Sequence, residues 1–363
     1  MKKKLLASVA ALSLMLTGCA SLLNRDYVHV TPHNTAPTAD GDPSILRAES
    51  YQELVNALLY FVTTGAETGS IRLYLDSADV EAYLEDACLE VVQEAPLGAY
   101  AVDFIKYSVN SVVTYSEADV QITYRRSRDQ IASIVSATGI TAIRSELESA
   151  MASFAPECVL RISYFEGDYE YIQTLIRQAY LAAPETALDY PQASVTFYPE
   201  NGRQRIVEVL LDYQLEQEEL AARKQALAQR TEALTADLWA AVDDQGLLDI
   251  RQAILELAAY DPEGGSTAYH ALVEHHADSL GLALAMSLLC EELDQHCRIV
   301  EGTLDGVPHD WNLVNTASGW RHVDLSAPES EGSPFRVDQE MWDAGSEWDT
   351  ASTPQSLPAQ AAE

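Results

Sequence analysis

Three polar residues in the last third of the 363-residue chain are of the types that carry out nucleophilic catalysis. Ser279 stands at the predicted start of an apolar helix, His309 stands just before a β-rich run, and Asp324 ends the next such run. A serine hydroxyl attacks an acyl group when a histidine takes its proton and a carboxylate fixes the tautomer of that histidine. The three residue types therefore predict a site for hydrolysis or acyl transfer, provided that the fold brings them together.

The residues around these positions form three motifs in a fixed order. They read ADSLGLA over 277–283, HDWN over 309–312 and WRHVD over 320–324. This run resembles the bacterial transglutaminase-like domain, whose pattern is C-x-G-[YF]-A at a helix start, then H-A-W-N, then W-[YH]-x-V-D. The resemblance covers the last third of the chain and implies a papain-like fold for that part.

The resemblance also implies roles for particular residues. It assigns the three triad positions to Ser279, His309 and Asp324. It implies that three further residues line the cleft: Gly281, Trp311 and Trp320. No cofactor and no metal ligand follow from it.

The chain departs from the family pattern at the nucleophile, because Ser279 stands where the family has cysteine. A helix N-terminus and an adjacent imidazolium stabilise a thiolate, whereas a serine must lose its proton to His309 during the reaction. Asp310 stands beside His309 where the family has a small residue, and a nearby carboxylate raises the pKa of a histidine. A protonated histidine is not a base.

These departures favour a domain that has lost catalysis and binds a peptide, glycan or protein at the cell surface. The alternative is a Ser-His-Asp hydrolase or acyltransferase that acts on peptide or cell-wall amide bonds. A third interpretation makes the protein an assembly or spacer component with a vestigial cleft.

The predicted elements place the three residues on one helix and two strands. An apolar helix runs from Ser279 through Leu289, and strands follow over 311–314 and 320–323. A connector helix over 214–234, rich in strong helix formers, leads into a transglutaminase-like domain over 235–349.

Before this domain the sequence predicts two αβαββ units, over 44–127 and 128–213, so that the fold class is α+β. In both units a strand is followed by an aspartate, Asp79 or Asp168, at the N-cap position of a helix. Tyrosine is frequent in the second unit. These tyrosines are expected either to form an exposed ligand-binding surface or to be core and rim residues of half-buried strands.

The two ends of the chain are expected to lie outside these domains. Residues 1–19 contain three lysines, a short apolar run and the sequence LTGC, which has the form of a lipoprotein signal with Cys19 as the lipidated residue. A diacylated cysteine would hold the protein on the extracytoplasmic face of a membrane. Residues 20–43 are expected to be a tether, and 350–363 a flexible tail.

Charge and cysteine content limit the partners further. The net charge of −34 opposes binding to nucleic acid, which carries one negative charge per phosphate. Four cysteines remain after Cys19, and an exported protein can hold them either as disulfides or as buried thiols. These four are Cys88, Cys158, Cys290 and Cys297.

Overall fold

The computed structural model describes residues 37–358, apart from 41, 76–78, 165, 239–243 and 328–332. The expected lipoprotein signal with Cys19, and most of the expected tether, lie outside these residues. The described chain is α+β and divides into two compact units. The first contains the residues up to Val92 and Val102–Tyr124, and the second contains Gln93–Ala101 and everything from Arg125 onward. No helix in the described ranges is long and apolar enough to span a membrane.

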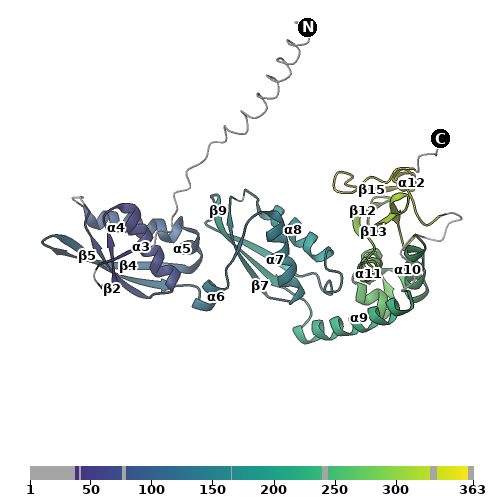
Figure 1. Ribbon diagram of the computed structural model, residues 1–363, viewed down its shortest axis with the longest axis horizontal. Coiled ribbons are helices and arrows are strands. Elements are labelled where there is room, and N and C mark those ends of the chain that lie inside the picture. Colours follow the sequence, from purple (N-terminus) through teal and green to yellow (C-terminus); the bar gives the residue numbers. More distant parts are fainter. Residues whose placement is uncertain are drawn as a thin grey trace, which may run out of the picture. The chain divides into compact units, whose positions relative to one another are not determined.

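The first unit is a five-stranded sheet with two helices (Figure 1). Its elements are β1 (Thr38–Asp40), β2 (Asp42–Ala48), α3 (Tyr51–Thr64), β3 (Thr68–Leu73), α4 (Val80–Gln93), β4 (Val102–Val112) and β5 (Tyr115–Tyr124). The strand order is β1-β2-β3-β5-β4, and only β2 and β3 are parallel. Helix α3 starts at the N-cap Ser50 and ends at Gly65, which adopts the left-handed conformation with φ 65° that glycine tolerates best.

The second unit begins with a sheet of similar topology. Its elements are α5 (Pro96–Ala101), α6 (Arg128–Ala132), β6 (Val135–Ala137), α7 (Ile140–Ala152), β7 (Glu157–Ser163), α8 (Tyr169–Leu181), β8 (Gln192–Tyr198) and β9 (Gln204–Asp212). The strand order is β6-β7-β9-β8, with β6 and β7 parallel and the other pairs antiparallel. Strands β2, β3, β5 and β4 of the first unit have the same order and directions.

Several predicted elements of the two sheets are confirmed and others are corrected. The aspartate caps are confirmed, since Asp79 and Asp168 accept the backbone N–H groups of Ala82 and Tyr171 at 3.0 and 2.9 Å. The predicted αβαββ pattern lacks the strand that precedes the first helix of each sheet, which is β2 in the first and β6 in the second. Strand β6 was missed because it has only three residues and shows no alternation of polar and apolar residues. Strand β1 and the first two residues of β2, Asp42 and Pro43, lie inside the segment 20–43 that was expected to be a tether.

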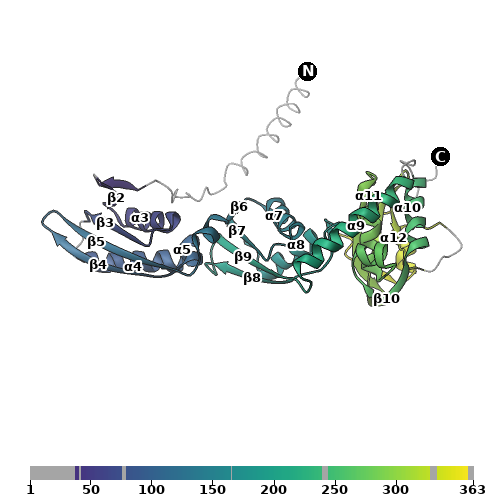
Figure 2. The same cartoon turned by 90° about the horizontal axis from the view of Figure 1, so that it is seen from below.

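The rest of the second unit holds the candidate site (Figure 2). Its elements are α9 (Gln217–Leu238), α10 (Asp244–Leu257), β10 (Ala259–Gly265), a π-helical turn η1 (His270–Glu274), β11 (His276–Ala277), α11 (Ser279–Glu292), β12 (Cys297–Leu304), β13 (Val307–Thr316), β14 (Gly319–Val323), α12 (Asp338–Asp343) and β15 (Ser346–Trp348). Strands β14-β13-β12-β15 form an antiparallel sheet, and α11 packs on β12 and β13.

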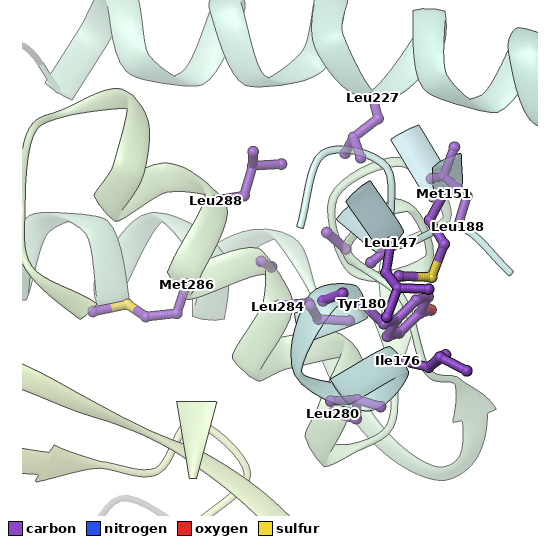
Figure 3. Close-up of a cluster of buried hydrophobic side chains, with 14 of the residues drawn as sticks. Leu147, Met151, Ile176, Tyr180, Leu188, Leu227, Leu280, Leu284, Met286 and Leu288 are labelled. Carbon is purple, nitrogen blue, oxygen red and sulfur yellow. The ribbon is translucent and has the colours of Figure 1, made fainter. Parts of the chain in front are cut away.

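Helix α11 is buried on nearly every side because two groups of elements pack against it. One is the sheet of β12 and β13, and the other includes α9 and α10. A single core cluster continues from α7 and α8 through Leu227 of α9 to α11. Figure 3 shows Leu280 and Leu284 of α11 beside Ile176 and Tyr180 of α8. The sheet of β6–β9 and the part that follows it therefore share one hydrophobic core.

Within the segment expected to be a flexible tail, Ser356 makes specific contacts with the domain. Ser356 is 1% exposed, and its backbone N–H donates to the carboxylate of Asp338 at 3.1 and 3.2 Å. Its hydroxyl donates to the carbonyl oxygen of Trp320 at 2.6 Å. The proline-rich and alanine-rich composition carried no sign of this, because the contacts are made by backbone groups and a single hydroxyl.

Candidate functional site

Ser279 is the first residue of α11 and is held there by the residue before it. Asp278 is the N-cap, and its Oδ1 accepts the backbone N–H of Gly281 at 2.8 Å. The other carboxylate oxygen of Asp278 accepts the hydroxyl of Ser266. Ser279 is buried and sits where the free N–H groups of a helix favour negative charge.

His309 and Asp324 form a buried hydrogen-bonded pair on the neighbouring sheet. His309 lies in β13, and Asp324 directly follows β14, which pairs with β13. The distance from His309 Nε2 to Asp324 Oδ2 is 3.0 Å, and both side chains are 6% exposed. The carboxylate thus fixes the orientation of the imidazole ring, as the third member of a catalytic triad does.

Ser279 meets the histidine strand through the backbone. Its Oγ accepts the N–H of Asp310 at 3.2 Å. Within the described ranges, no hydrogen bond joins Ser279 Oγ to the imidazole of His309, and both bonds of that ring involve Nε2. The structure therefore brings all three predicted residues to one place, with the serine and the histidine in adjacent positions rather than bonded to each other.

The electrostatics of the site favour a charged imidazole. Burial lowers the pKa of His309, but the hydrogen bond and charge of Asp324 and the charge of Asp310 together raise it above its ordinary value. Burial raises the pKa of Asp324, and its bonds to His309 and Ser326 outweigh this and lower it. Burial, reinforced by Glu301, raises the pKa of Asp310 to about 6. The expected effect of Asp310 on His309 is thus present and adds to that of Asp324.

The three residues expected to line a cleft differ in their burial. Gly281 is packed against the loop before α11, since a Cβ there would lie 2.6 Å from the carbonyl oxygen of Gly265. Trp311 is 1% exposed and stacks on His309 from inside, with ring centroids 6.1 Å apart. Trp320 is partly buried against a separate small cluster around Trp311. Trp311 thus supports His309 from within the core, and Gly281 and Trp311 are too deeply buried to form the wall of an open cleft.

Trp311 also belongs to a second buried network. Its Nε1 donates to His322 Nδ1 at 2.8 Å, and His322 Nε2 bonds to Asp338 Oδ1 at 2.9 Å. Burial lowers the pKa of His322 despite the opposing effect of Asp338. The side chain of His322 is fully buried and that of Asp338 is 12% exposed, and the pair holds β14 to the first residue of α12.

Sequence reasoning missed Ser326. Its hydroxyl donates to Asp324 Oδ1 at 2.6 Å and lies 3.1 Å from His309 Nε2, and its backbone N–H donates to the same carboxylate oxygen at 3.0 Å. A serine two residues after an aspartate at a strand end is typical of a turn in which the aspartate side chain accepts the backbone N–H of the serine. The sequence therefore contained a pattern from which this contact could have been predicted.

Sequence reasoning also missed Arg177 of α8, which reaches the sheet of the candidate site. Its Nε bonds to Glu301 Oε1 of β12 at 2.7 Å. The charge of Arg177 lowers the pKa of Asp310, which shows that it lies within electrostatic range of the residue after His309. Nothing in the sequence joins these two residues, because they are 124 positions apart.

The four cysteines that follow Cys19 are present as free thiols. Cys290 near the end of α11 is buried beside Cys297, and a hydrogen bond between the two thiols together with burial raises the pKa of Cys290 well above its ordinary value. Neither cysteine is near Ser279 on α11, so neither replaces the missing nucleophile. Within the described ranges, no group of three or more His, Cys, Asp or Glu residues could hold a metal ion.

Comparisons with known proteins give weak similarities only. No family model matches the chain, and no curated protein matches it. A crystal structure described as a TGase is 12% identical with a TM-score of 0.28, over 69% of this chain and 71% of the other. A candidate cysteine protease from Cytophaga hutchinsonii is 11% identical with a TM-score of 0.25, over 38% of this chain and 62% of the other.

A candidate protease from Parabacteroides distasonis is 10% identical with a TM-score of 0.21, over 74% of this chain and 45% of the other. The chain thus spans less than two thirds of the length of the second and third of these structures. At these TM-scores the similarities establish neither a family nor an activity. Support for a function has to come from the residues of the site.

Proposed function

We propose that residues 235–349 form a transglutaminase-like domain in which Ser279 takes the position of the nucleophile, and that this domain binds a peptide, glycan or protein without catalysing transpeptidation. The observation that carries this proposal is the bonding of the site. The imidazole of His309 is engaged by Asp324 and has a raised pKa, whereas Ser279 Oγ is bonded to the backbone N–H of Asp310.

Catalysis is not expected because a protonated His309 cannot accept the proton of a serine nucleophile. An imidazolium stabilises a thiolate, so the arrangement of Asp324 and His309 suits a cysteine. A serine needs a neutral imidazole that accepts its proton, and a raised pKa reduces the neutral fraction near pH 7. The site therefore keeps the polar framework of an acyl-transfer enzyme without a nucleophile that this framework activates.

A Ser-His-Asp hydrolase or acyltransferase is the second candidate function. The 3.0 Å bond between His309 and Asp324 favours it, because such a pair orients a general base. In that case hydrolysis would increase as the pH rises through the pKa of His309.

The proposal extends to the location and the origin of the rest of the chain. We expect lipidation of Cys19 to anchor the protein on the extracytoplasmic face of a membrane. We also expect the two α/β sheets to be copies of one unit, and their shared strand order supports this. Labelling with a radioactive fatty acid tests the anchor: label in the wild-type protein that is absent from Cys19→Ala is the expected result, and equal label in both would refute it.

Active-site labelling tests the function of the domain. A fluorophosphonate probe is applied to the wild-type protein and to Ser279→Ala, and iodoacetamide to Ser279→Cys. We expect no Ser279-dependent fluorophosphonate label but fast alkylation of Ser279→Cys relative to the thiols of the wild-type protein. Labelling that disappears in Ser279→Ala would replace the binding proposal by the hydrolase.

A further inference from the structure

A cavity of about 390 Å³ lies where the second α/β sheet meets the helix of the candidate site. Its walls come from α8, from the segments after α8 and before α9, from α9, from the residues between β10 and η1 with His270, and from Leu280 of α11. Two of these wall residues, Ser266 and Leu280, are direct neighbours of the site: Ser266 bonds to the N-cap Asp278, and Leu280 follows Ser279 in α11. The cavity has the size of a small-molecule binding site and opens next to the proposed nucleophile position.

Two arginines on different helices line this cavity, and each is held in the same way. Arg177 of α8 bonds through Nε to Glu301 at 2.7 Å, and Arg223 of α9 bonds through Nε to Glu219 at 2.8 Å. The guanidinium carbon of Arg177 lies 5.2 Å from the ring centroid of Tyr190, and that of Arg223 lies 4.9 Å from that of Tyr269, as in cation–π contacts.

This arrangement leaves the terminal nitrogens of both arginines available. In the described part of the chain, every hydrogen bond of these two guanidinium groups is made by Nε, and none by an Nη atom. An arginine that only joins two elements normally uses its terminal fork, because the two Nη groups match a carboxylate in a bidentate bond. Here the forks are oriented by the glutamates and the tyrosines but bind no acceptor among the described residues.

The other charged and polar groups of the cavity do not compete for these forks. Asp189 Oδ2 accepts the backbone N–H groups of Gln214 and Leu215 at 2.6 and 2.9 Å. Burial lowers the pKa of His270, and its Nδ1 lies 2.7 Å from the hydroxyl of Thr267. The remaining wall is largely apolar, from Leu188, Leu215, Leu280 and the two tyrosines Tyr180 and Tyr190.

We propose that this cavity binds the free C-terminal carboxylate of a short peptide with small apolar side chains. Arg177 and Arg223 hold the carboxylate, and the apolar wall takes the adjacent side chain. The preceding amide of the peptide then points along Ser266 and Leu280 toward Ser279. This assignment rests on the proposed function in one respect, the placing of an amide near Ser279, and deepens it by naming the ligand as a peptide end rather than a glycan or a folded protein.

The chemistry of the walls decides between a peptide and a simple anion. Inorganic phosphate would use the two arginines but would leave the apolar wall uncovered. A peptide end gains both the charge-assisted bonds and the burial of its side chain.

The experiment is calorimetric titration of the full-length Ser279→Ala protein, which cannot turn a peptide over by the triad. The ligands are tri-alanine with a free carboxylate, the same peptide as its C-terminal amide, and inorganic phosphate. We expect binding of the acid, with the amide and phosphate at least about tenfold weaker, since charged hydrogen bonds are lost in the amide and burial in phosphate. Equal binding of acid and amide, no binding of the acid at millimolar concentration, or equal binding of phosphate would overturn the proposal.

Substitutions locate the site. Arg177→Gln and Arg223→Gln, each added to Ser279→Ala, are expected to weaken binding of the acid by about tenfold. The matched control is Arg144→Gln, which breaks a partly exposed Arg144–Glu148 pair on α7 outside the cavity. Binding that Arg223→Gln and Arg177→Gln leave unchanged would remove the cavity as its location. The acid–amide comparison needs neither substitution, so it remains decisive if one of them unfolds the protein.

The two proposals fail separately. Fluorophosphonate labelling of Ser279 would refute the loss of catalysis and leave peptide binding in this cavity untouched. Equal affinity for acid and amide would refute this cavity and leave the binding function of the domain open to other ligands.

Discussion

Asp310 donates its backbone N–H to the hydroxyl oxygen of Ser279 over 3.2 Å. This bond joins the histidine strand to the first residue of α11, so the residue next to His309 contributes to the site through both its backbone and its side chain. The backbone group fixes Ser279. The carboxylate, buried near Glu301, has a pKa of about 6 and adds its negative charge to that of Asp324 around the imidazole.

Replacing the carboxylate while keeping the backbone separates these two contributions. In Asp310→Asn the pKa of His309 should fall, because one of the charges that raise it is gone. NMR titration of the His309 ring measures this, with His309→Gln to assign the signal. Asp305→Asn, in the turn between β12 and β13, is the control and should leave the titration unchanged. An unaltered His309 pKa in Asp310→Asn would mean that Asp324 alone holds the imidazolium.

The buried pair predicts how stability depends on pH. The pKa of Asp324 is lowered by folding, so its contribution is present above the ordinary carboxyl value and is lost as the pH falls through the folded one. The pKa of His309 is raised, so its contribution is complete below the ordinary imidazole value and is lost as the pH rises through the folded one. The pair should therefore stabilise most between about pH 4 and pH 6.5.

Urea unfolding of wild type and His309→Gln across this range measures the contribution. The difference in unfolding free energy should be largest near pH 5 to 6, roughly the middle of that window, and should shrink toward pH 8 and below pH 4. A difference that stays constant with pH would show that the loss comes from packing of the ring and not from its charge.

A site residue could be predicted where the sequence pattern that indicates it lies within its own helix, strand or turn. The motif residues Ser279, His309 and Asp324 are each tied to an element that has a clear pattern, an apolar helix or a β-rich run, and those elements form where expected. Ser326 was missed although its spacing from Asp324 is typical of a turn. Arg177 could not be predicted, because its contact with Glu301 joins two parts of the chain that are far apart in sequence and meet in one core.

The same distinction explains the errors in the fold. Helices with amphipathic patterns and capping aspartates were predicted closely, as for α4 and α8. The short strand β6 and the C-terminal residues around Ser356 gain their structure from pairing with distant backbone, which leaves no periodicity in the local sequence. Gly281 was expected to line the cleft, yet it packs closely against Gly265 and Ala277.

That packing makes Gly281 sensitive to the smallest side chain. In Gly281→Ala the new Cβ would lie 2.6 Å from the carbonyl oxygen of Gly265 and 2.7 Å from the Cβ of Ala277, so the start of α11 must move. We expect a loss of about 1–3 kcal/mol in unfolding free energy, as for other overpacked cores. Ser287→Ala, on the partly exposed side of the same helix, is the control and should be neutral or slightly stabilising, because alanine is the better helix former. Equal effects of the two changes would refute the close approach.

The indole of Trp311 determines the state of the second buried histidine. An indole N–H can only donate, so His322 Nδ1 must accept it, and Nε2 must carry the proton that bonds to Asp338. His322 is 0% exposed, and burial lowers its pKa, in agreement with a neutral ring. Two partners at fixed positions therefore select one tautomer of a neutral imidazole in the interior.

Trp311→Phe keeps an aromatic ring against His309 but removes the donor. His322 Nδ1 is then buried without a partner, which costs about 1–3 kcal/mol in addition to the volume lost from the indole. Trp348→Phe is the matched control, since Trp348 packs edge-on against Trp311 at 5.6 Å and its Nε1 bonds to the hydroxyl of Thr353 in a less buried position. Chemical denaturation should show a clearly larger loss for Trp311→Phe. If the two variants lose the same stability, the hydrogen bond to His322 adds nothing and the tryptophan acts by volume alone.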